Sequence, residues 1–231
     1  MKILIPPSEG KSSNNSTDTK FKNTDNIFFK EIRQVIKQLK ELEVSELPKI
    51  YGTSEEKANK IHQMNINIFD ADCTPAYSRY TGVVYNALGA NTLDKDAIEY
   101  CNNNFIITSA LLGLVSLGNL IPNYKLKMNV LKLTDFWKPK FSKIFEQEDL
   151  IIDALPQIHR KSFTASTNTI RIDFYKYKDG KKISAGHQGK SIKGKFLRFM
   201  AINRIDNIID LKKFREDGYI WNEDGFVNDL S

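Results

Sequence analysis

The sequence predicts a single domain of mixed α/β structure, and three observations support this. Short apolar runs typical of buried strands alternate with segments in which apolar residues recur at helical spacing. Neither an internal repeat nor an obvious linker divides the chain. A length of 231 residues is enough for one large domain with a sizeable core. We therefore expect one domain spanning residues 1–231.

The N-terminal part of the chain predicts one strand and two helices. An apolar run over residues 2–5 stops at Pro6-Pro7, and the Ser/Asn/Thr-rich residues 12–26 predict a mobile loop. From Phe28, apolar side chains recur at helical spacing, namely Ile32, Val35, Ile36, Leu39 and Leu42. Pro48 is expected to interrupt this pattern, and a second short helix is expected to begin at residues 52–54 and run towards Ile61.

The C-terminal part predicts three strands, a hairpin and a helix. Buried strands are expected at residues 105–109 and 150–153, and an alternating strand at 170–175. A turn at residues 178–181 would lead to the hairpin partner at 182–185. Residues 192–204 predict a helix with Ile192, Phe196 and Phe199 on its buried face, entered through a loop opened by glycines 186, 189 and 194.

Charge and cysteine content narrow the class of protein. A formal net charge of +6 favours anionic partners such as nucleic acid or phosphorylated ligands. Cys73 and Cys101 belong to no paired motif, so we expect two reduced thiols and neither a zinc site nor a disulfide. The apolar runs are too short for a signal peptide or a membrane span. We therefore expect a cytoplasmic protein without membrane contact.

No motif for catalysis or for a cofactor is complete. The Gly-Lys-Ser sequences at residues 10–12 and 189–191 resemble phosphate loops, but Ile5 and Ser184 occupy the positions where the first glycine is needed. The three histidines stand in unrelated contexts, and none has metal-ligand or nucleophile spacing. We therefore predict no catalytic residue, no metal and no cofactor.

One segment combines aromatic and cationic groups that can contact nucleic acid. Within residues 75–90, Tyr77, Arg79, Tyr80 and Tyr85 surround Gly82, and such groups can stack on bases and bind phosphates. The alternative is that the tyrosines cap the core and that Arg79 pairs with an acid. Small residues at 108–128 would allow close approach to the backbone before Tyr124 and Lys127, whereas the aromatic pair at 136–137 is expected in the core.

Taken together, these segments resemble the YaaA family of bacterial peroxide-stress proteins over almost the full chain. The similar blocks are residues 3–12, 82–85, 108–115, 123–128, 136–137, 190–194 with 198–199, and 217–219. Departures from the family pattern occur at Val83, Ser116, Lys125 and Lys127, and Lys127 stands where the family has an acid.

The resemblance implies a fold of unusual topology with a helix-hairpin-helix and a positively charged cleft. It further implies DNA binding and protection from oxidative damage linked to free iron. Our leading hypothesis is a non-enzymatic protein that holds duplex or distorted DNA by its backbone. The helix-hairpin-helix-like segment would lie at about residues 40–65, where amides at the start of its second helix could meet a phosphate. Ser54 replaces a consensus glycine there, and Glu55 and Glu56 oppose an anion, so an ordinary packed helical pair is the alternative.

The predicted site combines residues from the N-terminal, central and C-terminal parts of the chain. The predicted DNA-binding or cleft residues are Ser8, Lys11, Lys57, Lys60, Arg79, Tyr80, Tyr85, Tyr124, Lys127, Lys190, Lys193 and Arg198. A second hypothesis is an enzyme that acts on a nucleotide or nucleobase in the same cleft, and a third is a protein-interaction domain whose charge serves only solubility. A deep pocket that joins these groups would favour the enzyme, and a broad basic groove would favour DNA binding. No particular protein partner is indicated.

Overall fold

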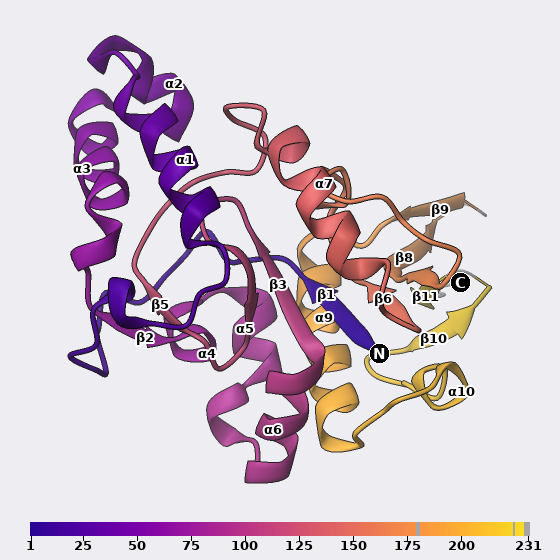
Figure 1. The fold of residues 1–231 in the computed structure, drawn as a ribbon. Helices are drawn as coiled ribbons and strands as arrows, with labels where there is room; N and C mark the ends of the chain where they lie inside the picture. The colour runs from indigo at the N-terminus through magenta and orange to yellow at the C-terminus, as the bar shows by residue number, and fades with distance from the viewer. Residues whose placement is uncertain (179–180, 224, 229–231) are drawn as a thin grey trace.

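The computed structural model describes residues 1–178, 181–223 and 225–228 (Figure 1). Within these residues it has a mixed α/β architecture of ten α-helices and three sheets, as the sequence predicts. The helices are α1 (Phe29–Lys40), α2 (Leu47–Tyr51), α3 (Glu55–Ile66), α4 (Ala76–Arg79), α5 (Val83–Leu88), α6 (Lys95–Asn104), α7 (Leu133–Phe145), α8 (Gln157–Arg160), α9 (Gly186–Ile202) and α10 (Ile208–Leu211). Short 3-10 turns lie at Phe21–Asn23, Val44–Glu46, Ile68–Asp70 and Ala90–Thr92.

A five-stranded sheet forms the centre of the molecule. Its strands lie in the order β4 (Gly113–Ser116), β3 (Phe105–Ser109), β1 (Lys2–Ile5), β6 (Ile151–Asp153) and β7 (Thr169–Arg171). The β1 strand pairs in parallel with β3 and with β6, β6 pairs in parallel with β7, and only β4 is antiparallel to its neighbour. The predicted strands at residues 2–5, 105–109 and 150–153 are therefore confirmed. The side chains of residues 3–5 are fully buried, as expected for a strand covered on both faces.

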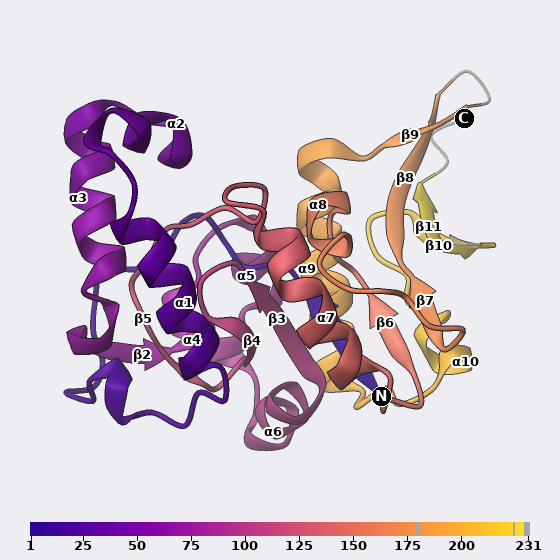
Figure 2. The same ribbon diagram turned by 45° about the horizontal axis from the view of Figure 1, so that its top comes forward.

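Helices cover both faces of this sheet. In Figure 2 the α7 helix lies in front of β1 and α9 behind it, and in Figure 1 α7 lies above β1 and α9 behind it. Trp137 on α7 is fully buried, stacks on Phe141 with ring centroids 5.0 Å apart, and donates its indole N–H to the carbonyl oxygen of Ala110 at 2.9 Å. The core interpretation of this aromatic residue is thus confirmed.

A second sheet stands beside the start of α9. Its order is β10 (Tyr219–Asn222), β11 (Gly225–Asn228), β8 (Asp173–Lys178) and β9 (Lys181–Ser184), and a third sheet pairs β2 (Cys73–Pro75) with β5 (Leu120–Pro122). The predicted hairpin is confirmed as β8 and β9, and the tip of its turn lies outside the described residues. The prediction of a single strand at 170–175 is wrong. The chain changes sheet at Ile172, because β7 before it pairs with β6 and β8 after it pairs with β11.

The N-terminal helices differ from the sequence prediction at one point. The α1 helix is confirmed, and its Ile32, Val35 and Leu39 side chains are fully buried. Pro48 does not end a helix: it lies in the first turn of α2, where its missing N–H costs no hydrogen bond. The predicted second helix is confirmed as α3, but it begins at Glu55 and continues past Ile61 to Ile66, and the Ser54 side chain before it makes no capping hydrogen bond.

The helix at the C-terminal side begins earlier than predicted. The α9 helix starts at residue 186 and ends at 202, so the glycines expected in a loop before it lie within its own sequence. Gly194 packs against α5, where an added Cβ would meet the backbone oxygen of Val84 and would lie 2.6 Å from Ala87 Cβ. This glycine is needed because the backbones of α5 and α9 approach each other closely.

The polar segment that follows β1 is irregular, as predicted, but it is tied to the third sheet. The backbone N–H of Ser16 donates to Thr74 Oγ1 at 2.8 Å, and the hydroxyl of Thr17 donates to the Cys73 carbonyl oxygen at 2.9 Å. None of the helices in the described ranges has the length and apolar character needed to span a membrane.

Candidate functional site

The topology of the central sheet marks one place for a ligand. From β1 the chain continues to β3 on one side, whereas from β6 it continues to β7 on the other side. Adjacent parallel strands whose connections diverge in this way leave a crevice at their carboxyl ends, and ligands of open α/β sheets bind in such crevices. The residues that follow β1 and β6, beginning at Pro6 and Ala154, are therefore the expected walls of a site.

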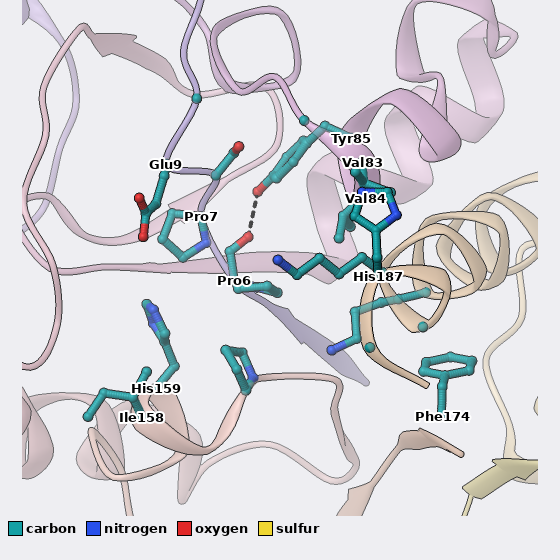
Figure 3. Close-up of a pocket in the computed structure, with 18 of the residues that line it drawn as sticks. Pro6, Pro7, Glu9, Val83, Val84, Tyr85, Ile158, His159, Phe174 and His187 are labelled. Carbon is teal, nitrogen blue, oxygen red and sulfur yellow. Dashed lines mark hydrogen bonds between the residues drawn. The ribbon is translucent and has the colours of Figure 1, made fainter. Parts of the chain in front are cut away.

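A cavity of about 810 Å³ occupies this position (Figure 3). Its size is typical of a small-molecule site. Five chain segments line it, namely residues 6–10 after β1, 82–85 at the start of α5, 156–159 after β6, 173–174 on β8, and 184–193 at the start of α9. Three of these segments contain blocks that carry the sequence resemblance described above.

The wall formed by residues 6–10 is held against the start of α5. The hydroxyl of Ser8 donates to the carbonyl oxygen of Thr81, and that of Tyr85 to the carbonyl oxygen of Pro6 at 2.8 Å, the dashed line in Figure 3. Gly82 has a φ of 107°, and an added Cβ would lie 2.9 Å from Ser8 Oγ. A side chain at Gly82 would be strained and would press on this loop.

The opposite wall is the first two turns of α9, which bring two lysines to the cavity. Lys190 and Lys193 are three residues apart and so lie on one helical face. The ammonium group of Lys193 donates to the Ala154 carbonyl oxygen at 2.5 Å, directly after β6. Burial lowers the pKa of Lys193 to about 8, although Asp173 and Asp153 act in the opposite direction.

The carboxylates near Lys193 are already engaged by arginines. Arg160 bonds to Asp153 Oδ2 at 2.8 Å and to Asp173 Oδ1 at 3.0 Å, and Arg171 bonds to Asp173 Oδ2 at 2.8 Å. Burial raises the pKa of Asp173, but the two arginines outweigh it and hold that pKa below its usual value. This part of the cavity wall is therefore close to electrically balanced, and Lys190 at its edge is exposed.

The histidine on the β6 side of the cavity is neutral. His159 Nδ1 lies 2.9 Å from Thr108 Oγ1, and burial lowers the pKa of the imidazole to about 4. Because this pKa lies below the usual range of histidine, the ring is uncharged at neutral pH. The neutral imidazole can donate or accept a hydrogen bond but adds no charge to the cavity. Figure 3 shows its ring directed into the cavity from below Glu9.

A second cluster lies behind the Ser8 loop. Lys11 Nζ donates to the Ser8 carbonyl oxygen at 2.8 Å and lies 4.2 Å from the ring centroid of Tyr124 and 5.2 Å from that of Tyr80. The two tyrosine hydroxyls are 2.6 Å apart, and Ser109 Oγ is 2.7 Å from that of Tyr124. Burial, then repulsion from Lys125, lowers the pKa of Lys11 to about 7.

Comparison with known proteins identifies the same family as the sequence blocks that line the cavity. The family described as "Peroxide stress protein YaaA" matches residues 1–225. The chain is 32% identical to a UPF0246 protein of Francisella tularensis subsp. novicida over 96% of both chains, and 31% identical to one of Francisella philomiragia over 95% of both. This chain belongs to the YaaA family. The resemblance stated from its motifs is thereby confirmed.

The predicted site residues of this YaaA protein do not all gather in one place. The cavity brings together Ser8, Tyr85, Lys190 and Lys193. Lys11, Tyr80 and Tyr124 form the adjoining cluster, where both tyrosines are 2% exposed and so belong to the core. Lys57 and Lys60 are exposed on α3, and Lys60 pairs with Glu56 at 2.6 Å. Lys127 lies between these regions, 4.0 Å from Glu9.

Two predicted arginines are bonded inside the protein. Arg79 is fully buried, and its guanidinium donates to the carbonyl oxygens of Ser12 and Asn14 and to Asn15 Oδ1 at 2.6–3.0 Å. Arg198 donates to the carbonyl oxygens of Leu88 and Gly89 at the end of α5. In this conformation both guanidinium groups hold backbone segments together, and the acid partner considered for Arg79 is replaced by carbonyl groups.

Four residues with ionisable side chains line the YaaA cavity but were not predicted as site residues. These are Glu9, His159, Asp173 and His187. Glu9 stands between two residues of the predicted Ser8–Lys11 block, and His187 precedes Lys190 by three positions, so adjacency to predicted residues was the available signal. Nothing in the sequence near residues 159 and 173 indicates that β6 and β8 bring them here, because that requires knowledge of strand order.

The chemistry open to this arrangement is recognition of an anion beside an apolar surface. Lysines and backbone amides can bind a phosphate or carboxylate, and prolines and valines supply apolar walls. Among the described residues, no three His, Cys, Asp or Glu side chains gather in a group that could hold a metal ion.

Proposed function

We propose that this YaaA protein acts in the peroxide stress response by binding the phosphate backbone of DNA in the cytoplasm, and that this binding limits iron-dependent oxidative damage to the DNA. The observation that supports it is the distribution of charge. Between Arg171 and Arg198 the sequence has nine basic and two acidic side chains, an excess larger than the +6 of the whole chain. Such a concentration of cations on one segment is the usual electrostatic footprint of nucleic-acid binding.

The fold presents much of this charge on one surface, which we call the α9 surface and define as β8, β9 and the first two turns of α9. All four residues of β9 are exposed; Lys181 lies on the same face of the hairpin as Lys176, Lys182 lies on the opposite face, and Lys190 is exposed on α9. The half-buried Lys176 and Tyr177 lie on the paired strand. Lysines bind phosphates as point charges without reading the bases, so the contact is expected to be independent of sequence.

We further propose that α2 and α3 act as a helix-hairpin-helix-like second contact. Gly52 ends α2 in the left-handed conformation with a φ of 63°, and Lys127 Nζ would lie 3.6 Å from a Cβ at that position. Because no side chain caps α3, amides of its first turn are available to a phosphate oxygen. Lys57 adds a cation there, but Glu55 and Glu56 in the same turn oppose the anion, so this contact is the weaker of the two.

A binding experiment at two salt concentrations tests the DNA hypothesis. Duplex, bulged and single-stranded oligonucleotides are titrated by fluorescence anisotropy with the wild-type protein and with Lys176→Ala/Lys181→Ala/Lys190→Ala. Each lost phosphate contact is expected to flatten the slope of log affinity against log salt by about 0.9 for duplex DNA. Lys30→Ala/Lys37→Ala/Lys40→Ala on α1 removes the same number of charges and is the matched control for general charge loss. Equal effects of the two variants would leave only nonspecific electrostatics and refute the α9 surface as the binding site.

The protective role has its own measurement. Supercoiled plasmid is exposed to ferrous iron and hydrogen peroxide with wild-type protein or with the α9-surface variant, and nicking is followed on gels. We expect less nicking with the wild-type protein, and less protection from the variant in proportion to its lost affinity. Equal protection by both proteins would separate any protective effect from DNA binding and refute this part of the proposal.

A further inference from the structure

The cavity at the carboxyl ends of β1 and β6 has features that contact with a DNA backbone does not require. A duplex backbone follows a surface, whereas this cavity is a partly open hollow of about 810 Å³ between five chain segments. It joins the Ser8, Tyr85 and Lys190–Lys193 groups, the arrangement that distinguishes a small-ligand site from a broad groove. It also lies at the switch point of the sheet, where nucleotides bind in other open α/β folds.

We propose that this cavity is a binding site for a mononucleotide, held by its phosphate at the start of α9 and by its base and sugar against the apolar wall opposite. This ligand is separate from DNA, and the inference does not depend on the proposed function. Three features of the cavity support the choice of ligand.

The first feature is a phosphate subsite with donors to spare. Lys193 uses one of its three N–H groups on the Ala154 carbonyl oxygen, so two remain for a ligand. Lys190 lies one turn away on the same face. The acids that could neutralise them, Asp153 and Asp173, are bonded to Arg160. An anion of one or two charges at Lys190 and Lys193 therefore meets little opposition from carboxylates.

The second feature is the backbone at the start of α9, which faces the same position. The first amide that bonds to a backbone carbonyl within the helix is that of Gly189, which donates to the Ala185 oxygen at 3.1 Å. The Gly186 amide reaches Ser184 Oγ at 3.3 Å. Glycines 186 and 189 both line the cavity, and the absence of a side chain at each lets a phosphate approach the backbone.

The third feature is the contrast between the two sides of the cavity. Across the cavity from α9 are Pro7 and Ile158, whose apolar surfaces can pack on a planar base, while Val83 lies beside His187 on the α9 side (Figure 3). Glu9 beside Pro7 has a carboxylate that is 73% exposed and only loosely paired with Lys127 at 4.0 Å. A carboxylate in this position can accept hydrogen bonds from ribose hydroxyl or base amino groups. Phosphate, sugar and base thus each find a complementary wall.

Isothermal titration calorimetry on the full chain tests the proposal, with AMP, GMP, CMP and UMP as probes and adenosine and inorganic phosphate as their two parts. At least one mononucleotide is expected to bind with a Kd below about 1 mM. Adenosine and phosphate are expected to bind about tenfold or more weakly, because each occupies half of the site. Absence of binding by all four nucleotides, or equal binding of AMP and adenosine, would overturn the inference.

Variants locate the site on the protein. Lys190→Gln and Lys193→Gln are each expected to weaken nucleotide binding about tenfold, the usual effect of losing one charge-assisted hydrogen bond. Lys195→Gln is the matched control on α9, since Lys195 bonds to Glu216 and Asp217 instead of facing the cavity. Circular dichroism checks that each variant is folded, and Lys190, being exposed, carries the test if the Lys193 variant unfolds. Equal loss in the control would refute the assignment.

Competition separates this site from the DNA surface. A blunt duplex without terminal phosphates is added to the nucleotide-bound protein. We expect the nucleotide to remain bound, because a duplex is too wide to enter a cavity of this size and reaches it only at Lys190, the exposed residue on its edge that the two sites share. Displacement in proportion to duplex binding would show that the cavity belongs to the DNA path, and the proposal of a separate nucleotide site would then be wrong even if DNA binding is confirmed.

Discussion

The α9 surface and the α2–α3 pair both carry exposed lysines, but the two regions differ in what surrounds those lysines. On α3, Lys60 is held by Glu56 at 2.6 Å, and both glutamates of the first turn lie near Lys57. Beside α9, the Asp173 carboxylate is bonded to two arginines and does not pair with Lys190. The number of lysines is therefore a poor guide to anion binding, and the placement of the acids decides it.

The two regions also differ in how tightly they are built, and this gives the largest expected effect. Gly194→Ala would place a methyl group against Val84 and Ala87 of α5, whereas Gly52→Ala meets no backbone and is strained only by its φ of 63°. We expect a loss of about 3 kcal/mol in the free energy of unfolding for Gly194→Ala. About 1 kcal/mol is expected for Gly52→Ala.

Urea denaturation followed by circular dichroism measures both losses. If the two variants unfold at similar urea midpoints, the α5–α9 contact relaxes around the added methyl group. The expected difference in rigidity between the two regions would then be wrong. The wild-type slope of free energy against urea serves as the check that both variants unfold as the parent does.

The next effect concerns Lys11, in the cluster behind the Ser8 loop. The pKa of its ammonium group is lowered from 10.5 to about 7, chiefly by burial. Between these values the unfolded chain holds a proton that the folded protein has released, so stability rises with pH in this window. One such group contributes at most about 1.4 kcal/mol per pH unit.

Thermal unfolding of wild-type protein and Lys11→Met between pH 7.5 and 9.5 tests this effect. The variant is expected to lack the rise contributed by Lys11, while Lys37→Met, at an exposed lysine on α1, is expected to keep it. Parallel curves for wild type and Lys11→Met would show that the ammonium group stays charged between the two tyrosine rings.

The contrast between the regions explains how much the sequence could predict. The spacing of apolar residues was enough to predict α1, whose inward residues are buried. Short apolar runs were enough to predict β1, β3 and β6, which are covered on both faces. The same periodicity missed the start of α9, because Gly186 and Gly189 are poor helix formers in isolation. Here tertiary packing on α5 and β8 overrides the local preference.

The site was predicted in pieces for a related reason. Residues near Ser8, Gly82 and Lys190 stood out because their charge and glycine content is visible in the sequence. That they share one cavity depends on the order of the strands, which places the ends of β1 and β6 side by side. Arg79 shows an error of the other kind. From the sequence, an arginine among tyrosines was predicted to bind phosphate, but in the structure its guanidinium is bonded to backbone carbonyl groups.

A charge-reversal experiment compares the two regions directly for DNA binding. Lys190→Glu is expected to weaken affinity about tenfold, and Lys57→Glu about threefold, since the α3 site is already opposed by acids. Anisotropy titrations at one fixed salt concentration measure both, with Lys37→Glu as the control on α1. A larger effect at Lys57 would reverse the ranking of the two surfaces and make the α2–α3 pair the principal contact.

The smallest effect comes from the ion pair on α3 and tests whether that helix meets DNA at all. Glu56→Gln removes a surface pair with Lys60, which costs about 0.3–0.5 kcal/mol of stability. The same change deletes a negative charge beside the proposed phosphate position and releases a lysine, so DNA affinity is expected to rise about twofold. Glu41→Gln is the control for the charge change, because it removes one carboxylate from a looser i,i+4 pair, 4.0 Å from Lys37 on α1. A gain in affinity confined to Glu56→Gln would place the DNA against α3, and equal affinities for both variants would confine the DNA to the α9 surface.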